Sequence, residues 1–247
     1  MQETEYDTMY RLEDNHWWFQ AKRNYVRRIL DIYIGRDKGR ILDLGCGTGR
    51  MLALLKTYGR VFGVDYHDRA CRFSCRRTGP RIVRGDANRL PFKPGSFELV
   101  SAFDLLYHQG ILDDEQVIGQ VHELLADGGY FLVTDSAWDF LKSRHDLAVM
   151  TRHRYTVGEL AGKMEKHRFE ILKKTYLYGL TFPLVAASRL WDKLRLGRGP
   201  LEVRSDLKET GPRLNALVRR VLSWEARLIE RVNIPCGSSL MILGRKR

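Results

Sequence analysis

The chain of 247 residues lacks long apolar runs and has few cysteines. A membrane-spanning helix needs roughly 20 consecutive apolar residues, and no stretch approaches that length. Residues 1–7 are acidic and contain no apolar signal core, so export is not expected. Cys46, Cys71, Cys75 and Cys236 form no Cys-Xaa-Xaa-Cys pair. We therefore expect a cytoplasmic protein with free thiols and no metal site.

Positive charge is in excess, with a formal net charge of +12. Residues 68–84 and residues 189–231 each carry a net charge of +5. Basic surfaces attract nucleic acid, anionic lipid or anionic small molecules, although solvated helices also carry Lys and Arg for solubility alone. No RNA-binding module is recognisable, which disfavours nucleic acid as a partner. Peripheral membrane contact and the oligomeric state stay open.

Residues 41–50 read Ile-Leu-Asp-Leu-Gly-Cys-Gly-Thr-Gly-Arg and carry the strongest signal. The apolar run before Gly45 predicts a buried parallel strand, and the residues after Gly49 predict a helix. Glycines between them permit positive φ and let a ligand approach the backbone. Dinucleotide-binding folds share such a loop, but Asp43 would repel a diphosphate. A carboxylate there suits the ammonium and sulfonium of S-adenosylmethionine, which has no phosphate.

Three further segments follow in register. Residues 61–65 predict a second strand ending in Asp65, whose carboxylate can hold ribose hydroxyls, as it would in a nicotinamide enzyme. Residues 82–92 place Asp86 after a third strand, where an acid can accept from an adenine amino group and the Ala87 amide can serve a ring nitrogen. Residues 97–103 predict a fourth strand.

These segments, Asp-Leu-Gly-Cys-Gly-Thr-Gly, Val-Asp65, Gly-Asp86-Ala and Ser-Phe-Glu-Leu-Val, resemble the class I S-adenosylmethionine-dependent methyltransferases. The resemblance covers roughly residues 37–179 and the C-terminal strand. It implies an α/β, Rossmann-like sheet of seven strands with the last strand antiparallel, and S-adenosylhomocysteine as the product. The cofactor-binding residues that it implies are Asp43, Gly45, Cys46, Gly47, Gly49, Asp65, Tyr66, Asp86, Ala87, Phe103, His16 and Trp17.

Two helical segments are expected outside the core. Residues 1–36 form an N-terminal helical lid, residues 37–179 the cofactor-binding core, residues 180–232 a helical insert capping the substrate side, and residues 233–247 the closing strand. In the insert, an apolar stripe from Leu214 to Val232 includes Glu225, which we expect to pair with an arginine.

Smaller features fix the limits of elements in the core. Thr156 and Glu159 predict a capping box that begins a helix running to about residue 166. A helix over residues 113–125 and a turn at residues 127–129 are expected before a fifth strand at residues 130–134.

Histidines after the fourth and fifth strands are the candidates for chemistry. His108, His145 and His153 are the predicted catalytic residues, because a histidine near its ordinary pKa can accept a proton from the acceptor. Tyr107, Asp146 and Tyr155 are the predicted substrate-binding residues. Together with His-Trp-Trp-Phe at residues 16–19, the His-Asp and Arg-Tyr-Thr segments resemble a bacterial methyltransferase subgroup.

The sequence disfavours two nucleic-acid chemistries. No Asn/Asp-Pro-Pro-aromatic motif follows the fourth strand, and no cysteine lies in that loop for attack on a pyrimidine. We expect methylation of oxygen or nitrogen on a small-molecule acceptor that is anionic or lipid-linked. An RNA methyltransferase using the basic surfaces and an inactive cofactor-binding scaffold are the alternatives.

Overall fold

The computed structural model describes residues 3–37, 39–195 and 209–247. Seven strands form one sheet in the order β3-β2-β1-β4-β5-β7-β6, and β7 is antiparallel to both of its neighbours. This confirms the expected seven-stranded α/β sheet. The strands are β1 (Arg40–Leu44), β2 (Arg60–Asp65), β3 (Ile82–Arg84), β4 (Phe97–Phe103), β5 (Leu125–Ser136), β6 (Phe169–Leu177) and β7 (Ser239–Lys246).

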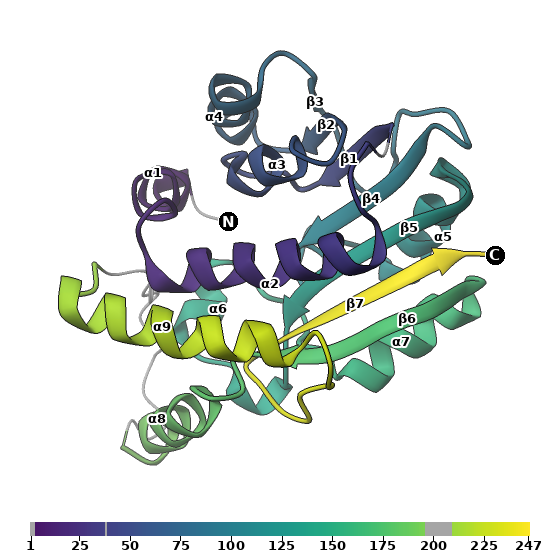
Figure 1. Cartoon of the computed structure of the whole chain (residues 1–247). Coiled ribbons are helices and arrows are strands. Elements are labelled where there is room, and N and C mark those ends of the chain that lie inside the picture. The colour runs from purple at the N-terminus through teal and green to yellow at the C-terminus, as the bar shows by residue number, and fades with distance from the viewer. Residues whose placement is uncertain (1–2, 38, 196–208) are drawn as a thin grey trace.

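Helices cover both faces of the sheet (Figure 1). They are α1 (Glu3–Leu12), α2 (Trp17–Tyr33), α3 (Arg50–Leu55), α4 (Asp68–Thr78), α5 (Asp114–Leu124), η1 (Asp139–Leu141), α6 (Arg144–Ala148), α7 (Val157–Lys166), α8 (Phe182–Arg195) and α9 (Pro212–Leu228). Within the described ranges, no helix is both long and apolar enough to cross a membrane.

Two apolar cores hold these layers together. One core packs α5 and α7 against one face of the sheet and includes Val121, Met164 and Phe131. The other packs α2, α3 and α9 against the opposite face and includes Ile29 and Met241. Central strands such as β1 and β4 are buried on both faces, as expected for parallel strands between helices. The C-terminal ends of the parallel strands are therefore left to form a site.

The fifth strand begins earlier than the sequence predicts. β5 starts at Leu125, directly after α5, so residues 127–129 lie inside the strand rather than in a turn before it. Gly128 has φ +72°, and the pairing with β4 shifts register between Phe97 and Leu99. The glycines therefore form an irregularity within the strand. The predicted capping box is confirmed, since the Glu159 amide donates to Thr156 Oγ1 at 3.1 Å.

The structure corrects the expected partner of Glu225. No arginine pairs with this buried carboxylate among the described residues; it accepts from the Tyr25 hydroxyl at 2.9 Å and from the amides of Gly179 and Leu180 at 3.0 and 2.8 Å. These three neutral donors fill lone pairs of the carboxylate that would otherwise be unsatisfied in the buried site. Glu225 thereby joins α9 to α2 and to the end of β6.

The apolar residues of α9, expected to form a single stripe, lie on two faces of the helix, one buried and one exposed. Leu222, Ala226 and Ile229 are buried toward α2, whereas Leu214 and Leu217 are 56% and 61% exposed. The sequence pattern did not separate them because apolar residues occupy more of the helix circumference than one buried face needs.

Candidate active site

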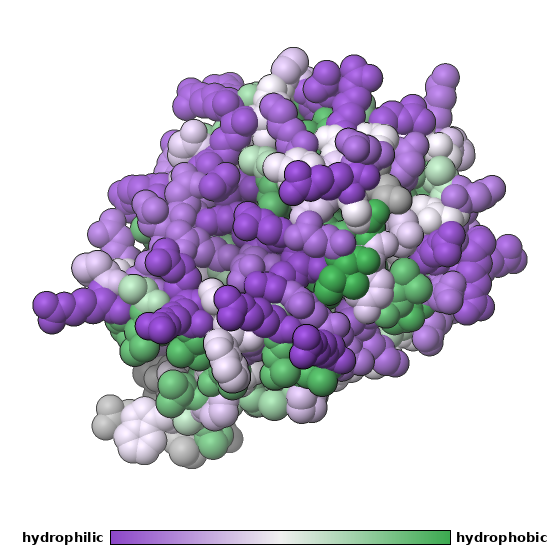
Figure 2. Space-filling view, in the orientation of Figure 1, coloured by the Kyte–Doolittle hydropathy of each residue, from purple (hydrophilic) through white to green (hydrophobic). Residues whose placement is uncertain are grey.

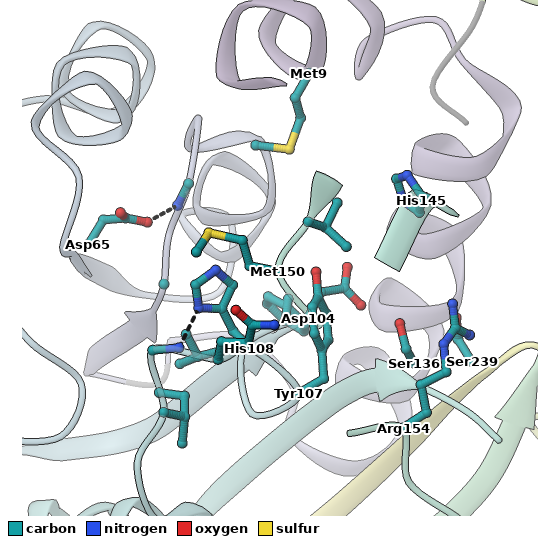
Figure 3. A pocket seen from close by; sticks show the side chains of 18 of the residues that line it. Met9, Asp65, Asp104, Tyr107, His108, Ser136, His145, Met150, Arg154 and Ser239 are labelled. Atoms are coloured by element: carbon teal, nitrogen blue, oxygen red, sulfur yellow. Dashed lines mark hydrogen bonds between the residues drawn. The ribbon is translucent and has the colours of Figure 1, made fainter. Parts of the chain in front are cut away.

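One large cavity of about 1030 Å³ lies at the C-terminal ends of the strands. Figure 3 shows Asp65 at one end and Ser136, Arg154 and Ser239 at the other, with Tyr107 between them. Ligand pockets commonly measure roughly 300–1,000 Å³. The cavity is therefore large enough to hold two small molecules side by side.

The glycine loop forms one wall of this cavity. Gly45 and Gly47 line it and have φ values of +66° and +53°. A Cβ on Gly45 would lie 2.9 Å from Leu105, and one on Gly47 would lie 3.3 Å from Met9 of α1. Both positions therefore need glycine, for the backbone angle and for the space that α1 and the loop after β4 leave open.

Asp65 connects the end of β2 to the glycine loop. Its carboxylate accepts from the Gly47 and His67 amides, each at 2.9 Å. Carboxylate oxygens have about four lone-pair positions, so Asp65 keeps acceptor capacity for ligand hydroxyls. This geometry fits the predicted ribose contact, because the residue is fixed in place and faces the cavity.

Asp43 lies beneath the loop and lines a second cavity of about 80 Å³ together with Cys46. Its carboxylate accepts from the Ser101 hydroxyl at 2.7 Å. Burial raises the pKa of Asp43 to about 7, with the Ser101 hydrogen bond acting in the opposite direction. A cationic ligand next to this carboxyl would favour its ionised form. The Asp43 carboxylate, which can accept hydrogen bonds, thus fits the ammonium group of S-adenosylmethionine.

The predicted adenine end contains Tyr66, Asp86 and Ala87, and all three line the large cavity. The Asp86 carboxylate accepts from the Asn88 backbone and side chain at 2.9 and 2.7 Å. Asn88 in turn donates to the Gly110 carbonyl at 2.8 Å. The acid therefore also holds the loop after β3 against the loop after β4.

The N-terminal helices close the cavity from above the glycine loop. Tyr6 and Met9 of α1 line it, as do His16 and Trp17 at the start of α2. α1 is held by Glu13, which accepts from the Thr48 hydroxyl at 2.6 Å and pairs with Arg77 at 2.9 Å. His16 caps α2 by accepting from the Trp18 amide at 3.3 Å. The predicted lid residues thus lie at the cavity.

The loop after β4 places Phe103, Tyr107 and His108 in the cavity lining. His108 Nδ1 accepts from the Gly110 amide at 2.9 Å, and burial lowers the pKa of His108 to about 4. This result differs from the expected base near neutral pH, because burial disfavours the imidazolium. Burial and the nearby Asp104 raise the pKa of Tyr107 well above its usual value, so its hydroxyl stays protonated.

A buried ion pair that the sequence did not reveal lies beside these residues. Lys22 of α2 pairs with Asp104, and its ammonium lies 3.8 Å from the centre of the Trp18 ring. Asp104 has φ +54°, which is rare for a residue with a Cβ. Asp135, fully buried at the end of β5, accepts from the Tyr107 amide at 3.2 Å. The network joins the N-terminal helices to the loop after β4.

The far end of the cavity contains residues from β5, α6, α8 and β7. His145 lines it, together with Arg154, the arginine of the Arg-Tyr-Thr segment, which was not among the predicted site residues. Asp146 does not line the cavity; it accepts from Arg154 at 2.7 and 3.0 Å and so orients the guanidinium. The other residues that the sequence analysis missed here are Ser136, Arg189, Ser238 and Ser239.

Besides Asp146, three predicted residues lie outside both cavities. Gly49 precedes α3, where a Cβ would lie 2.7 Å from Ser74 Cα, so its role is close packing against α4. His153 lies between Asp139 and Glu159, at 3.1 and 2.9 Å. Tyr155 is fully buried and donates to Asp114 and to the Leu106 carbonyl. The predicted ligand contacts of these residues have no support in the geometry.

The sheet order, the antiparallel last strand and a site at the strand ends define the class I methyltransferase fold. Residues 42–133 match the family model described as a methyltransferase domain. A putative methyltransferase of Haloferax volcanii, solved with the Trm112 methyltransferase activator, superposes with a TM-score of 0.62 at 17% identity, covering 98% of this chain and 94% of that one.

Two curated relatives are also methyltransferases. Demethylmenaquinone methyltransferase of Thermus thermophilus is 30% identical over 47% of this chain and 56% of its own length. 24-methylenesterol C-methyltransferase 2 of Oryza sativa is 26% identical over 72% of this chain and 53% of its own length. The chain thus spans about half the length of these relatives. Residues 42–133 thus match a methyltransferase domain, within a chain that has the fold of the class I methyltransferases.

Proposed function

We propose that this chain transfers a methyl group from S-adenosylmethionine to an oxygen or nitrogen atom of a small, anionic or lipid-linked acceptor. The observation that carries the proposal is that a single cavity runs from Asp65 and the glycine loop to Arg154. A cofactor held at the first end would direct its methyl group toward the second. One arginine oriented by an acid, with serines beside it, suits an anionic or hydroxylated group.

S-adenosylmethionine supplies an electrophilic methyl group on a sulfonium. The new bond to the acceptor forms as the carbon–sulfur bond breaks, so the protein mainly has to align the reacting atoms and exclude water. Tyr107 and Asp104 lie between the two ends of the cavity and can orient the acceptor. A proton released by the acceptor can pass to His145 or to solvent, because the low pKa makes His108 a weak base.

Cofactor binding can be tested by calorimetry with S-adenosylmethionine, S-adenosylhomocysteine and NAD. We expect the first two to bind and NAD not to bind. Asp65→Ala removes an acceptor for the ribose and a partner of the Gly47 amide. Loss of a hydrogen bond to a charged group costs about 1.5–3 kcal/mol, so affinity should fall about tenfold or more.

Asp68→Ala is the matched control, since this acid lies three residues later, at the start of α4, and its carboxylate pairs with Arg72. It should leave cofactor affinity unchanged. Tight NAD binding, or equal affinities for Asp65→Ala and the parent protein, would contradict the proposed cofactor site. Transfer itself is tested by the appearance of S-adenosylhomocysteine together with a methylated acceptor.

A further inference from the structure

The exposed apolar side chains of this protein are concentrated in the insert. Seventeen large apolar residues are exposed in the described chain, and ten of them fall within residues 180–232. Isolated exposed apolar residues are common, whereas a concentration of them marks a binding surface. Of these ten, the most exposed are Leu184 at 76% and Trp224 at 72%.

Helix α9 carries these residues in a regular pattern. Its inner side packs on α2 through Leu222, Ala226 and Ile229. The outer side presents an apolar row with the spacing of one helix face. We call this row the α9 face; it comprises Leu214, Leu217, Val221, Trp224 and Leu228. Figure 2 shows hydrophobic side chains along the lower edge of α9.

Positive charge follows one edge of the α9 face. Arg213, Arg220, Arg227 and Arg231 are exposed and recur at helical spacing beside the apolar row. Among the described residues, no ion pair holds any of the four; the interhelical pair nearby is Arg28 with Glu230. An amphipathic helix with Leu and Trp on its apolar side and arginines along the edge has the composition of a helix that lies in the headgroup region of a bilayer.

The inner side of α9, opposite the α9 face, contacts the lid of the cavity. Asn215 of α9 accepts from the Trp17 amide at 2.7 Å and donates to the Asn15 carbonyl at 2.9 Å. In α8, Val185 and Arg189 line the cavity while Leu184 and Trp191 are exposed. Both insert helices thus have one side at the cavity or its lid and an apolar side open to the surroundings.

We propose that the α9 face docks on an anionic membrane surface. The four arginines select negative headgroups, and the apolar row enters the boundary between headgroups and acyl chains. Trp17 contacts the inner side of α9, so the lid of the cavity lies directly behind the docked helix. An acceptor attached to lipid would then be held close to the cavity. The docking does not depend on methyl transfer, so the two are tested separately.

The test is sedimentation of the purified full chain with vesicles, without cofactor. We expect binding to vesicles of equal parts phosphatidylcholine and phosphatidylglycerol, little binding to phosphatidylcholine alone, and weaker binding as salt rises. Trp224→Glu should weaken binding at least about tenfold. Arg227→Gln should weaken it about fivefold, the effect of one basic residue near an anionic surface.

Matched controls lie elsewhere on the surface. Ile32→Glu replaces an apolar residue that is 50% exposed on α2, and Arg60→Gln removes an exposed arginine at the edge of β2. Both should bind anionic vesicles like the parent protein. Circular dichroism melts must show that each variant is folded, which the exposure of these side chains favours.

The proposal is overturned if the parent protein ignores anionic vesicles at low salt, or if Trp224→Glu binds them as the parent does. It is also overturned if light scattering shows a parent dimer that Trp224→Glu dissolves while vesicle binding is unaffected. In that case the α9 face joins two copies of the chain. Cofactor affinity, measured on the same samples, should be unchanged by any of the four substitutions.

Discussion

The two ends of the cavity are built in different ways. At the cofactor end, backbone geometry provides most of the site, through the positive φ angles of Gly45 and Gly47 and the amide that holds Asp65. In the middle of the cavity and at its far end, where the acceptor would bind (the acceptor end), side chains from distant parts of the chain meet. Lys22 pairs with Asp104, 82 residues away, and Arg154 and Arg189 come from different segments of the chain.

This difference decides which part can be altered without loss of the fold. A glycine loop needs a few local residues and one supporting acid, so it tolerates many surroundings. The middle of the cavity and the acceptor end depend on buried charges, each of which must keep its partner. Changes there should therefore cost stability as well as function, and three measurements can test this comparison.

The largest effect should come from breaking the pair between Lys22 and Asp104. Lys22→Met keeps the apolar stem against Trp18 but leaves Asp104 and the buried Asp135 without their cation. Removing one partner of a buried ion pair costs about 3–5 kcal/mol, and the partial exposure of Asp104 places the expected loss near the lower limit. Urea denaturation measures the free energy of unfolding.

The matched control is the surface pair of Lys142 and Asp139, whose side chains are 39% and 51% exposed. Lys142→Met should cost less than about 1 kcal/mol, as is usual for exposed pairs. A double variant, Lys22→Met with Asp104→Asn, should recover part of the loss because it removes the unpaired charge. Equal losses for Lys22→Met and Lys142→Met would show that the buried charges in the middle of the cavity do not need their partners for stability.

Much of the fold could be predicted from the sequence because its signals are local. The spacing from Asp43 through the glycines to Asp65 and Asp86 follows from strands of fixed length and short turns. The seven-stranded sheet and its antiparallel last strand followed from the resemblance that those segments carry, and the structure confirms both. The capping box at Thr156 was predictable because both of its partners lie within one turn.

The side-chain contacts beyond the glycine loop could not be predicted in the same way. A lysine at position 22 shares the buried side of α2 with Tyr25 and Val26, and this was the available signal for a buried cation. Its partner could not be inferred, because the ion pair forms only when α2 packs over the end of β4. His153 and Tyr155 were chosen for their chemistry, yet the chain uses both in structural contacts outside the cavity. The sequence shows which side chains are present, but not whether each one faces the cavity or makes a structural contact elsewhere.

A smaller effect should appear in the pH dependence of cofactor affinity. In the free protein burial raises the pKa of Asp43 to about 7, so below that pH the carboxyl carries a proton that a cationic ligand must displace. Affinity for S-adenosylmethionine should therefore fall as pH decreases from about 7, approaching tenfold per pH unit. Above pH 7 the carboxylate is already ionised and contributes no further change.

Calorimetry in two buffers with different ionisation enthalpies counts the proton released on binding. Asp43→Asn keeps the size of the side chain and cannot ionise, so it should bind weakly and lose this pH dependence. Glu98→Gln changes an acid outside both cavities and should retain the parent profile. A parent affinity that is constant from about pH 6 to about pH 8 would show that Asp43 does not face the cation.

The smallest effect should be that of His108 on the pH profile of turnover. Burial lowers the pKa of His108 to about 4, and its Nδ1 already accepts from the Gly110 amide. The group is therefore neutral throughout the physiological range and a weak proton acceptor. With an acceptor identified, His108→Asn should reduce turnover by far less than the roughly hundredfold or greater loss caused by removing a general base. Its profile should match the parent profile above about pH 5.

Nuclear magnetic resonance can test the cause without an acceptor. The ring signals of His108, assigned by their absence in His108→Asn, should begin to shift only as pH approaches about 4. His145→Asn, made at the acceptor end of the same cavity, provides the kinetic comparison. A larger loss of turnover in His145→Asn than in His108→Asn would place proton transfer at the acceptor end. A His108 signal that titrates near pH 6.5, together with a large loss of turnover in His108→Asn, would instead identify His108, in the loop after β4, as the proton acceptor.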